Sequence, residues 1–307
     1  MKVAAGVKAS VLKHLKSSVV TLGVFDGVHL AHQKIINKTI TEAKRLKAKS
    51  IVLTFEKHPK KTTHKKAPPI LTATEKKIEL IKKLGVDILV LIDFNRKFAS
   101  ITARSFIENI LAGKLKAKEV VIGHDYGFGR DKEGNDLLLK KEGRLFGFKT
   151  RVISPVLKNK KVISSTEIRN AVLSGDISAA KKYLGRDYSV IGRVESGKKL
   201  GRTFGFPTAN LNCFNEVVPK EGVYAVRIRL EGKSYKGACS ITSPTFDRAD
   251  AIVKPEVFIF DFKKSIYNKI MEVYFIKRIR GSRKFTGIPS LVKQIKKDIT
   301  VINKALK

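Results

Sequence analysis

Residues 19–33 read VVTLGVFDGVHLAHQ, and this stretch decides the fold of the first half of the chain. Its first four residues, Val19–Leu22, form an apolar run typical of a buried parallel strand. A glycine-containing turn follows, and from Gln33 onward the apolar residues recur with helical spacing. The order of strand, glycine turn and helix predicts the first βα unit of a parallel sheet.

Two histidines, His29 and His32, lie where that helix is predicted to start. Residues three apart share one face of a helix, and a helix N-terminus presents unpaired N–H groups and a positive dipole end to an anion. A single histidine near a turn is more often a surface or core residue. Two at this spacing, directly after a strand, favour a phosphate site.

The same alternation of strands and helices continues to about residue 186. Further strands are predicted at Ser50–Phe55, Ile88–Ile92, Val120–Gly123 and Lys149–Ile153, with helices at Gln33–Leu46, Thr74–Leu84 and Ala103–Leu111. We also expect a short strand within the first 18 residues. This pattern predicts a doubly wound parallel sheet, whose ligands bind at the carboxyl ends of the strands.

Three residues that follow the predicted strands are candidates for a ligand pocket. Phe55 ends one predicted strand and Pro59 follows it, and Asp125 lies in the glycine-rich sequence GHDYGFG after another. Glycines permit a close approach to the backbone and aromatic rings offer stacking surface. A simple turn aspartate is the alternative interpretation of Asp125.

The pattern changes after Tyr188, where short β-branched strands alternate with tight turns. We expect strands at Ser189–Val194, Pro207–Leu211, Gly222–Leu230, Tyr235–Ile241, Glu256–Phe262 and Ile270–Ile279, and an amphipathic helix at Ser290–Lys307. These elements predict a six-stranded antiparallel barrel closed by the helix. The predicted domains are therefore residues 1–186 and 187–307.

The second domain carries a glycine-rich basic loop, GKKLGRTFGFPTANL, at residues 197–211. Thr208 and Asn210 provide two neutral oxygens on one side of an extended segment, which suits Mg²⁺ and phosphate. Glu256 is a lone acid entering a barrel strand. It is a candidate general base for a substrate hydroxyl, and an edge-strand charge is the alternative.

A second candidate phosphate clamp lies at the start of a predicted helix, where Ser165 and Thr166 precede Arg169. Hydroxyls and helix N–H groups bind phosphate oxygens, and a guanidinium can bind the same anion through two donors. On its own the Ser-Thr pair is more often an ordinary N-cap. In combination with the upstream histidines it suggests one nucleotide site.

The composition narrows the class of protein. The net charge of +36 raises the hypothesis of nucleic-acid binding. However, residues 1–186 hold 39 Lys+Arg and 16 Asp+Glu, and residues 187–307 hold 24 Lys+Arg and 11 Asp+Glu, so the positive charge is spread evenly over the two halves. We interpret most of it as lysines on solvated faces. There is no apolar run of about 18 residues, and the two cysteines have no metal-ligand spacing, which fits a cytoplasmic protein outside the membrane.

Together these motifs resemble the bacterial bifunctional riboflavin kinase/FMN adenylyltransferases, also called FAD synthetases, over essentially the whole chain. The resemblance implies that the second domain phosphorylates riboflavin to FMN with MgATP, and that the first adenylates FMN to FAD and releases pyrophosphate. It implies three small-molecule partners, riboflavin, FMN and ATP, and no specific nucleic acid or membrane partner. A weak homo-oligomer is left open.

The motifs and the resemblance together suggest roles for individual residues. ATP in the first domain is expected at Gly23, Phe25, Asp26, Gly27, His29, His32, Ser165, Thr166 and Arg169, of which His29, His32 and Arg169 are the catalytic candidates. The flavin is expected at Phe55, Pro59 and Asp125. ATP in the second domain is expected at Lys198, Gly201, Gly205, Thr208 and Asn210, with Thr208 and Asn210 also binding Mg²⁺ and Glu256 as the base.

Two departures from the family pattern bear on these expectations. Ala31 stands where the family keeps a glycine between the histidines, and residues 240–243 are shorter than the usual loop and lack its asparagine, glycine and arginine. An enzyme with only the adenylyltransferase active is therefore one alternative. A basic RNA-associated protein is another, and it requires a clustered arginine and aromatic face.

Overall fold

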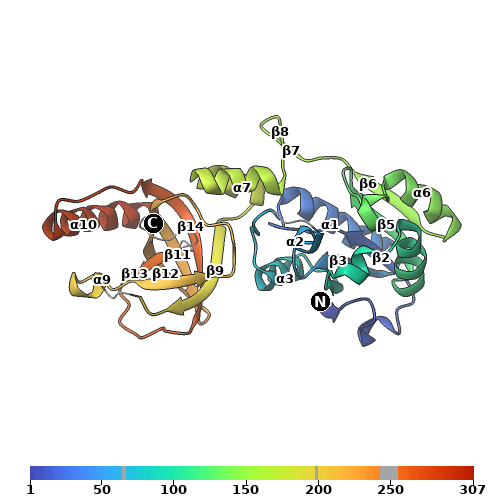
Figure 1. Ribbon diagram of the computed structural model, residues 1–307, viewed down its shortest axis with the longest axis horizontal. Coiled ribbons are helices and arrows are strands. Elements are labelled where there is room, and N and C mark those ends of the chain that lie inside the picture. Colours follow the sequence, from blue (N-terminus) through green and yellow to red (C-terminus); the bar gives the residue numbers. More distant parts are fainter. Residues whose placement is uncertain (64–66, 198–199, 243–254) are drawn as a thin grey trace. The chain divides into compact units, whose positions relative to one another are not determined.

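The computed structural model describes residues 1–63, 67–197, 200–242 and 255–307. The chain divides into two compact units. Unit 1 contains Met1–Pro68 and Thr74–Ser164, and unit 2 contains Pro69–Ala73 and Ser165–Lys307. Each unit is described by itself (Figure 1).

Unit 1 is built on a six-stranded parallel sheet, as the sequence predicts. The strands are β1 (Lys2–Ala5), β2 (Ser18–Leu22), β3 (Lys49–Phe55), β4 (Ile88–Ile92), β5 (Ala117–Gly123) and β6 (Lys149–Ile153). Their order is β1-β4-β3-β2-β5-β6, and every neighbouring pair is parallel. The expected short strand near the N-terminus is β1, and it pairs with β4 at the edge of the sheet.

Helices cover both faces of this sheet. The helical segments of unit 1 are η1 (Ser10–Leu12), α1 (Leu30–Arg45), α2 (Lys60–Thr63), α3 (Thr74–Lys83), α4 (Arg96–Ala99), α5 (Ala103–Ser105), η2 (Phe106–Lys114), η3 (Arg130–Lys132) and α6 (Asp136–Leu145). On one face Ile36 of α1 and Ile81 of α3 pack against Val52, whereas Ile107 and Leu139 pack on the other face. The doubly wound arrangement is therefore confirmed.

The predicted helix at Ala103–Leu111 has a different geometry from the one expected. A short α-helical turn, α5, continues into the π-helical segment η2. The Leu115 N–H accordingly donates to the Ile110 carbonyl, five residues earlier, at 2.8 Å. Apolar periodicity cannot separate the two helix types, because both present one apolar face over so short a length.

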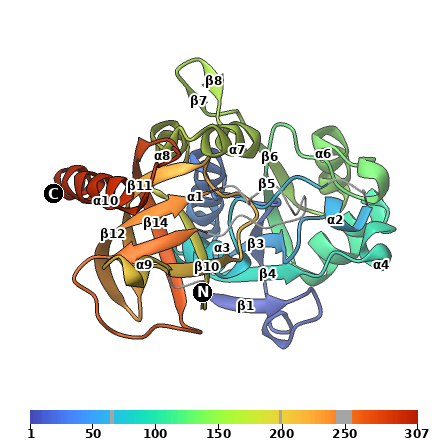
Figure 2. The ribbon, with the colours of Figure 1, turned by 60° about the vertical axis from the view of Figure 1, so that its left-hand side comes forward.

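The core of unit 2 is a closed antiparallel barrel of six strands, also as predicted. The strands are β9 (Tyr188–Glu195), β10 (Ala209–Cys213), β11 (Gly222–Leu230), β12 (Lys233–Ile241), β13 (Glu256–Ile259) and β14 (Ile270–Arg280), in the order β10-β13-β12-β11-β14-β9. The remaining helices of this unit are α7 (Ser165–Ser174), α8 (Ile177–Leu184), α9 (Leu200–Thr203) and α10 (Ile288–Ala305). Figure 2 shows α10 beside the barrel strands, where its buried Ile302 packs against Ala225.

A short segment from the first half of the sequence, Pro69–Ala73, belongs to unit 2. The side chain of Leu71 is 1% exposed in the core of this unit, and its carbonyl accepts hydrogen bonds from Asn215 Nδ2 at 2.7 Å and Tyr188 Oη at 3.2 Å. The Ile70 N–H donates to the Glu216 carboxylate at 2.9 Å. We call this segment the strap.

Unit 1 also contains a small antiparallel hairpin, β7 (Leu157–Lys158) and β8 (Lys161–Val162). The boundary between the compact units, at residue 164, lies before the functional boundary expected near residue 186. Helices α7 and α8 cluster with the barrel because Ile168, Val172, Ile177 and Leu184 share its apolar core. A division of activities near residue 186 stays a prediction.

Candidate active sites

The first candidate site lies between β2 and α1 in unit 1. The turn that joins them is tightly wound, with positive φ angles at Phe25 (51°), Gly27 (87°) and Val28 (39°). Such angles strain any residue with a Cβ atom, so the turn concentrates backbone strain at the carboxyl end of the sheet. Thr54 Oγ1, near the end of β3, donates to the Val24 carbonyl at 2.9 Å and holds the turn against the sheet.

The two histidines are stacked at the start of α1. His29 is the N-cap residue, and its Nδ1 accepts a hydrogen bond from the His32 backbone N–H at 3.3 Å. The ring centroids are 3.5 Å apart, and the edge of His32 meets Phe25 at 5.2 Å. Because Nδ1 of His29 is an acceptor, a neutral His29 carries its proton on Nε2, where it can donate to an anion.

The remaining residues expected in this turn lie beside the histidines. Asp26 is 4% exposed, and the side chain of Phe25 packs so closely on Gly23 that a Cβ there would lie 3.0 Å from the ring. Ala31 is half-buried in the first turn of α1. The predicted phosphate site is therefore assembled from a single strand, turn and helix, at the edge of the sheet where ligands bind.

A chain of aromatic rings lies at the carboxyl ends of the neighbouring strands. Phe55, the last residue of β3, makes edge contacts with Phe94 at 5.3 Å and with Phe98 at 6.4 Å. The chain continues through Phe106 and Phe128, and Tyr126 stacks on Phe128 at 5.9 Å. Burial raises the pKa of Tyr126 above its usual value, so this phenol stays neutral.

The other two expected flavin residues are near this aromatic chain in sequence but differ in exposure. Pro59 is half-buried after β3, and its carbonyl accepts from the Thr62 N–H at 3.0 Å. Asp125 follows β5, and its side chain is 84% exposed, 3.9 Å from Nδ1 of His124. Phe94 and Phe98 were not among the predicted flavin residues, although Phe94 follows the end of β4 by two residues; Phe98 lies in α4.

Ser165, Thr166 and Arg169 lie on α7, in unit 2. Ser165 begins the helix, and Arg169 is 9% exposed, with its Nε donating to the Pro69 carbonyl of the strap at 2.8 Å. The histidines belong to unit 1, so the joint phosphate clamp stays a prediction.

The second candidate site lies on the barrel. Asn210 on β10 is directly opposite Glu256 on β13, and Glu256 is directly opposite Ser240 on β12. Their neighbours Leu211, Val257 and Cys239 are buried in the barrel core, so these three polar residues share the outer face. An amide, a carboxylate and a hydroxyl therefore form one row across three strands.

The glycine loop packs directly on this row. A Cβ on Gly197 would lie 2.0 Å from Nδ2 of Asn210, and a Cβ on Gly201 would lie 2.4 Å from the Phe206 carbonyl. Gly205 has a φ of 84°, which favours glycine. The glycines are thus required by close packing and backbone geometry. Lys198 and Ser243 lie outside the described residues.

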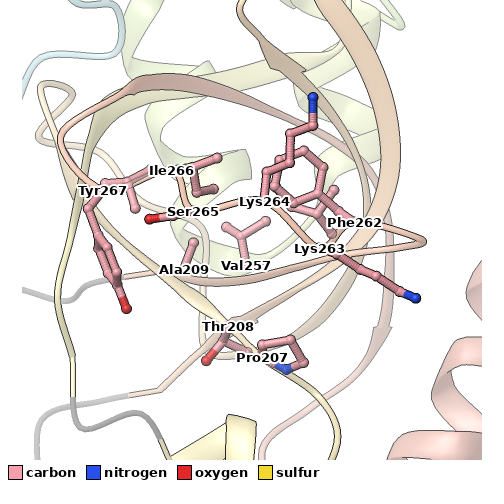
Figure 3. Close-up of a pocket in the computed structure, with 12 residues that line it drawn as sticks. Pro207, Thr208, Ala209, Val257, Phe262, Lys263, Lys264, Ser265, Ile266 and Tyr267 are labelled. Atoms are coloured by element: carbon pink, nitrogen blue, oxygen red, sulfur yellow. The ribbon is translucent and has the colours of Figure 1, made fainter.

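A pocket opens at one end of the barrel, next to the row (Figure 3). Pro207, Thr208 and Ala209 line one side, and Val257 and the segment from Phe262 to Tyr267 line the other. Ala209 precedes Asn210, Val257 follows Glu256, and these two neighbours are paired with each other. They therefore lie on the opposite face of the strands from the row. The pocket therefore contacts the inner face of the strands that carry the row on their outer face.

The residues expected to bind Mg²⁺ offer suitable donors. Thr208 and Asn210 supply a hydroxyl and a carboxamide oxygen, both of which suit Mg²⁺ when substrate phosphates and water complete its octahedron. Over the described part of the chain there is no group of three or more His, Cys, Asp or Glu residues arranged to hold a metal.

Comparisons with known proteins match the two halves of the chain to two different families. The FAD synthetase family matches residues 11–167, and the riboflavin kinase family matches residues 184–306. The chain belongs to the family of bifunctional riboflavin kinase/FMN adenylyltransferases. Among its relatives of that name, the protein from Buchnera aphidicola of Schizaphis graminum is 39% identical over 95% of this chain and 96% of its own. The protein from Bacillus subtilis is 39% identical over 92% of this chain and 90% of its own length.

A solved structure matches the chain throughout. A protein from Streptococcus pneumoniae, described as a macrolide-efflux protein, superposes with a TM-score of 0.85 at 34% identity and covers 98% of both chains. In the described ranges of this chain, none of the helices has the length and apolar character needed to cross a membrane. The match supports the arrangement of a parallel sheet followed by a barrel.

Proposed function

We propose that the chain makes FAD from riboflavin in two ATP-dependent reactions, one in each half. The observation that carries this is the order of the two family matches, each of which spans one candidate site: the histidine turn in the first and the Asn210–Glu256 row in the second. Neither the single-activity alternative nor the RNA-associated alternative is favoured, because both families match and the relatives carry both activities in their names.

In the kinase reaction, riboflavin would bind with its terminal hydroxyl beside the row on the outer face of the barrel, where the ATP phosphates would also bind. Glu256 is the base that accepts the hydroxyl proton while the oxygen attacks the γ-phosphorus, and the bond to ADP breaks. Thr208 and Asn210 bind the nucleotide phosphates together with Mg²⁺, which neutralises their charge when bound. The glycine loop, from Gly197 to Gly205, brings backbone N–H groups close to those phosphates.

In the adenylyltransferase reaction, an FMN phosphate oxygen attacks the α-phosphorus of ATP and pyrophosphate leaves. No enzyme nucleophile is needed, so the protein contributes position and charge. His29, His32 and the N–H groups of the Asp26–Gly27 turn bind the ATP phosphates, with Ser165, Thr166 and Arg169 as the second clamp. The aromatic chain from Phe55 to Tyr126, with Pro59 and Asp125, forms the flavin side.

The chemistry predicts the setting in which the enzyme works. Its substrates riboflavin, FMN and ATP are small and soluble, which agrees with a cytoplasmic location and no specific nucleic-acid or membrane partner. The experiment that tests the adenylyltransferase half is incubation with FMN, ATP and Mg²⁺, followed by separation of flavins. FAD and an equal amount of pyrophosphate are expected, and FMN left unchanged would contradict the proposal.

A further inference from the structure

The guanidinium of Arg169, expected in the second phosphate clamp, is bonded to the strap. Arg169 lies four residues after Ser165 on α7, so the two side chains share one face of the helix. It is buried, and a buried cation needs polar partners. One of these partners is the Pro69 carbonyl, which accepts from Nε at 2.8 Å. Because the five donors of a guanidinium lie in one plane, this bond restricts the direction of the two Nη groups.

The strap is fixed in turn by a buried amide, Asn215, which lies in the half of the chain that matches the riboflavin kinase family. Its Nδ2 donates to the Leu71 carbonyl at 2.7 Å, and its Oδ1 accepts from the Ile191 N–H at 3.0 Å. Ile191 belongs to β9, one of the six strands of the closed barrel. One side chain therefore joins a barrel strand to the strap, two residues after the carbonyl that binds Arg169.

The backbone of the strap follows the same segment of unit 2. The Ile70 carbonyl accepts from the Glu216 N–H at 3.1 Å, and the ring of Pro69 fixes the φ angle of that residue. Only Ile70 separates Pro69 from Leu71, so a displacement at the Leu71 carbonyl also moves the Pro69 carbonyl. The hydrogen bond of Asn215 therefore controls the position of an acceptor of Arg169.

The strap is also continuous with unit 1, because the chain enters it from Pro68 and leaves it at Thr74. Thr74 begins α3, and its Oγ1 donates to the Glu56 carbonyl, directly after β3, at 2.9 Å. The last residue of β3 is Phe55, which is expected on the flavin side of the first site. The strap is thus a short piece of chain between a residue expected to bind ATP and a strand end expected to face the flavin.

We propose that Asn215, in the kinase half of the chain, is a positioning residue for adenylyl transfer: it fixes the strap, whose Pro69 carbonyl orients the Arg169 guanidinium that binds ATP. This rests on the proposed role of Arg169 as an ATP clamp. Without the amide, the Leu71 carbonyl loses this donor and the strap is less restrained. A displaced guanidinium then binds ATP less well, whereas the row on the outer face of the barrel keeps its strand register.

The test measures both reactions with Asn215→Ala in the full chain, once the wild type is shown to make FAD from FMN. The KM for ATP in adenylyl transfer should rise about tenfold, with a smaller change in the KM for FMN. Riboflavin phosphorylation by the same sample should keep its KM for ATP within about twofold. A merely structural role would impair the kinase first, because Asn215 bonds to a barrel strand. Equal losses in both reactions, or an unchanged KM for ATP in adenylyl transfer, would overturn the proposal.

Two further variants serve as control and as second test. Asn212→Ala removes an amide that donates to Glu195 at 2.6 Å within the barrel and does not contact the strap, so FAD formation from FMN should match the wild type. Pro69→Gly removes an exposed side chain but frees the backbone at the carbonyl that binds Arg169. It should raise the KM for ATP in adenylyl transfer at least about threefold, and it decides the question if Asn215→Ala does not fold. A wild-type value in Pro69→Gly would overturn the proposal.

A double-mutant cycle with Arg169→Ala separates this inference from the proposed function. If Asn215 acts through Arg169, adding Asn215→Ala to Arg169→Ala should change the KM for ATP by no more than about twofold. Effects that multiply in the double variant would overturn the inference and leave the proposed clamp standing. A wild-type KM for ATP in Arg169→Ala alone would contradict the proposed clamp, and the inference with it.

Discussion

Asn210 and Glu256 lie directly opposite each other on β10 and β13, on the outer face of the barrel, and the adjacent pair Ala209 and Val257 lines the pocket on the inner face. One register therefore fixes the amide, the carboxylate and the pocket wall at once. A shift of one residue would exchange the inner and outer sets, so strand register is a requirement for the kinase site.

We expect Glu256→Gln to lower FMN formation from riboflavin by a factor on the order of 10² to 10⁴, because the amide keeps the shape but cannot accept the proton. Conversion of FMN to FAD should be unchanged, since the histidine turn is separate in the sequence. Glu231→Gln is the control, because Glu231 is exposed in the β11–β12 turn and pairs with Lys269 at 2.7 Å. Loss of both activities in Glu256→Gln would contradict two independent sites.

Gly27→Ala should impair FAD formation from FMN, because its φ of 87° strains an alanine by about 1–2 kcal/mol and shifts the turn before His29. Gly85→Ala is the matched control. Gly85 has a similar φ of 89° with open space around it, but it lies after the C-terminal end of α3 and not in the turn before His29. Both variants should lose similar stability in urea unfolding. Only Gly27→Ala should lower kcat/KM for ATP, and equal activity in the two variants would count against the turn as the ATP site.

Lys77 should make the stability of the protein depend on pH. Its pKa falls from 10.5 to about 8 on folding, so between these values the unfolded chain binds more protons and the free energy of unfolding rises with pH. Between pH 7.5 and 9.5 the rise should be about 2 kcal/mol. Urea unfolding of the wild type and of Lys77→Met at both pH values gives this contribution as the difference between their free energies of unfolding. If that difference does not increase from pH 7.5 to pH 9.5, Lys77 is not buried as a charged group.

Leu71→Ala should destabilise unit 2 by about 2–5 kcal/mol, because it leaves a cavity in the barrel core where the strap inserts. Leu173→Ala on α7 is the control: Leu173 is 50% exposed and should change stability by no more than about 0.5 kcal/mol. The measurement is chemical denaturation of each variant. Equal stability of the two variants would mean that the strap does not contribute to the core.

The elements that carry both candidate sites follow from the sequence because their local patterns agree with the fold. The run Val19–Leu22 is buried along its whole length, and buried and more exposed residues alternate along the barrel strand β9. The positions of His29, Asn210 and Glu256 at these elements could therefore be predicted, whereas Thr208 lies just before β10 and not on the strand expected at Pro207–Leu211. The register of the barrel strands could not be predicted, because it depends on which strands pair with one another.

Two features could not be read from local pattern. The strap, Pro69–Ala73, has no periodicity, and its place in the core of unit 2 depends on hydrogen bonds to Asn215 and Tyr188, more than 100 residues away. Lys77 looks like a solvated residue because its helix is rich in lysine. Only the fold brings its ammonium to the Phe55 carbonyl, so its burial is visible in the structure alone.

The most direct test of the central claim supplies riboflavin as the only flavin, with ATP and Mg²⁺, to the purified full chain and separates the flavins over time. We predict that FMN appears first and is then converted to FAD, because the kinase half makes the substrate of the adenylyltransferase half. Addition of a chelator at the start should stop the reaction, since ATP phosphates are expected to bind with Mg²⁺. A parallel reaction starts from FMN. If it yields FAD while riboflavin yields no FMN, the kinase half is contradicted; if neither flavin yields a product, the account as a whole is contradicted.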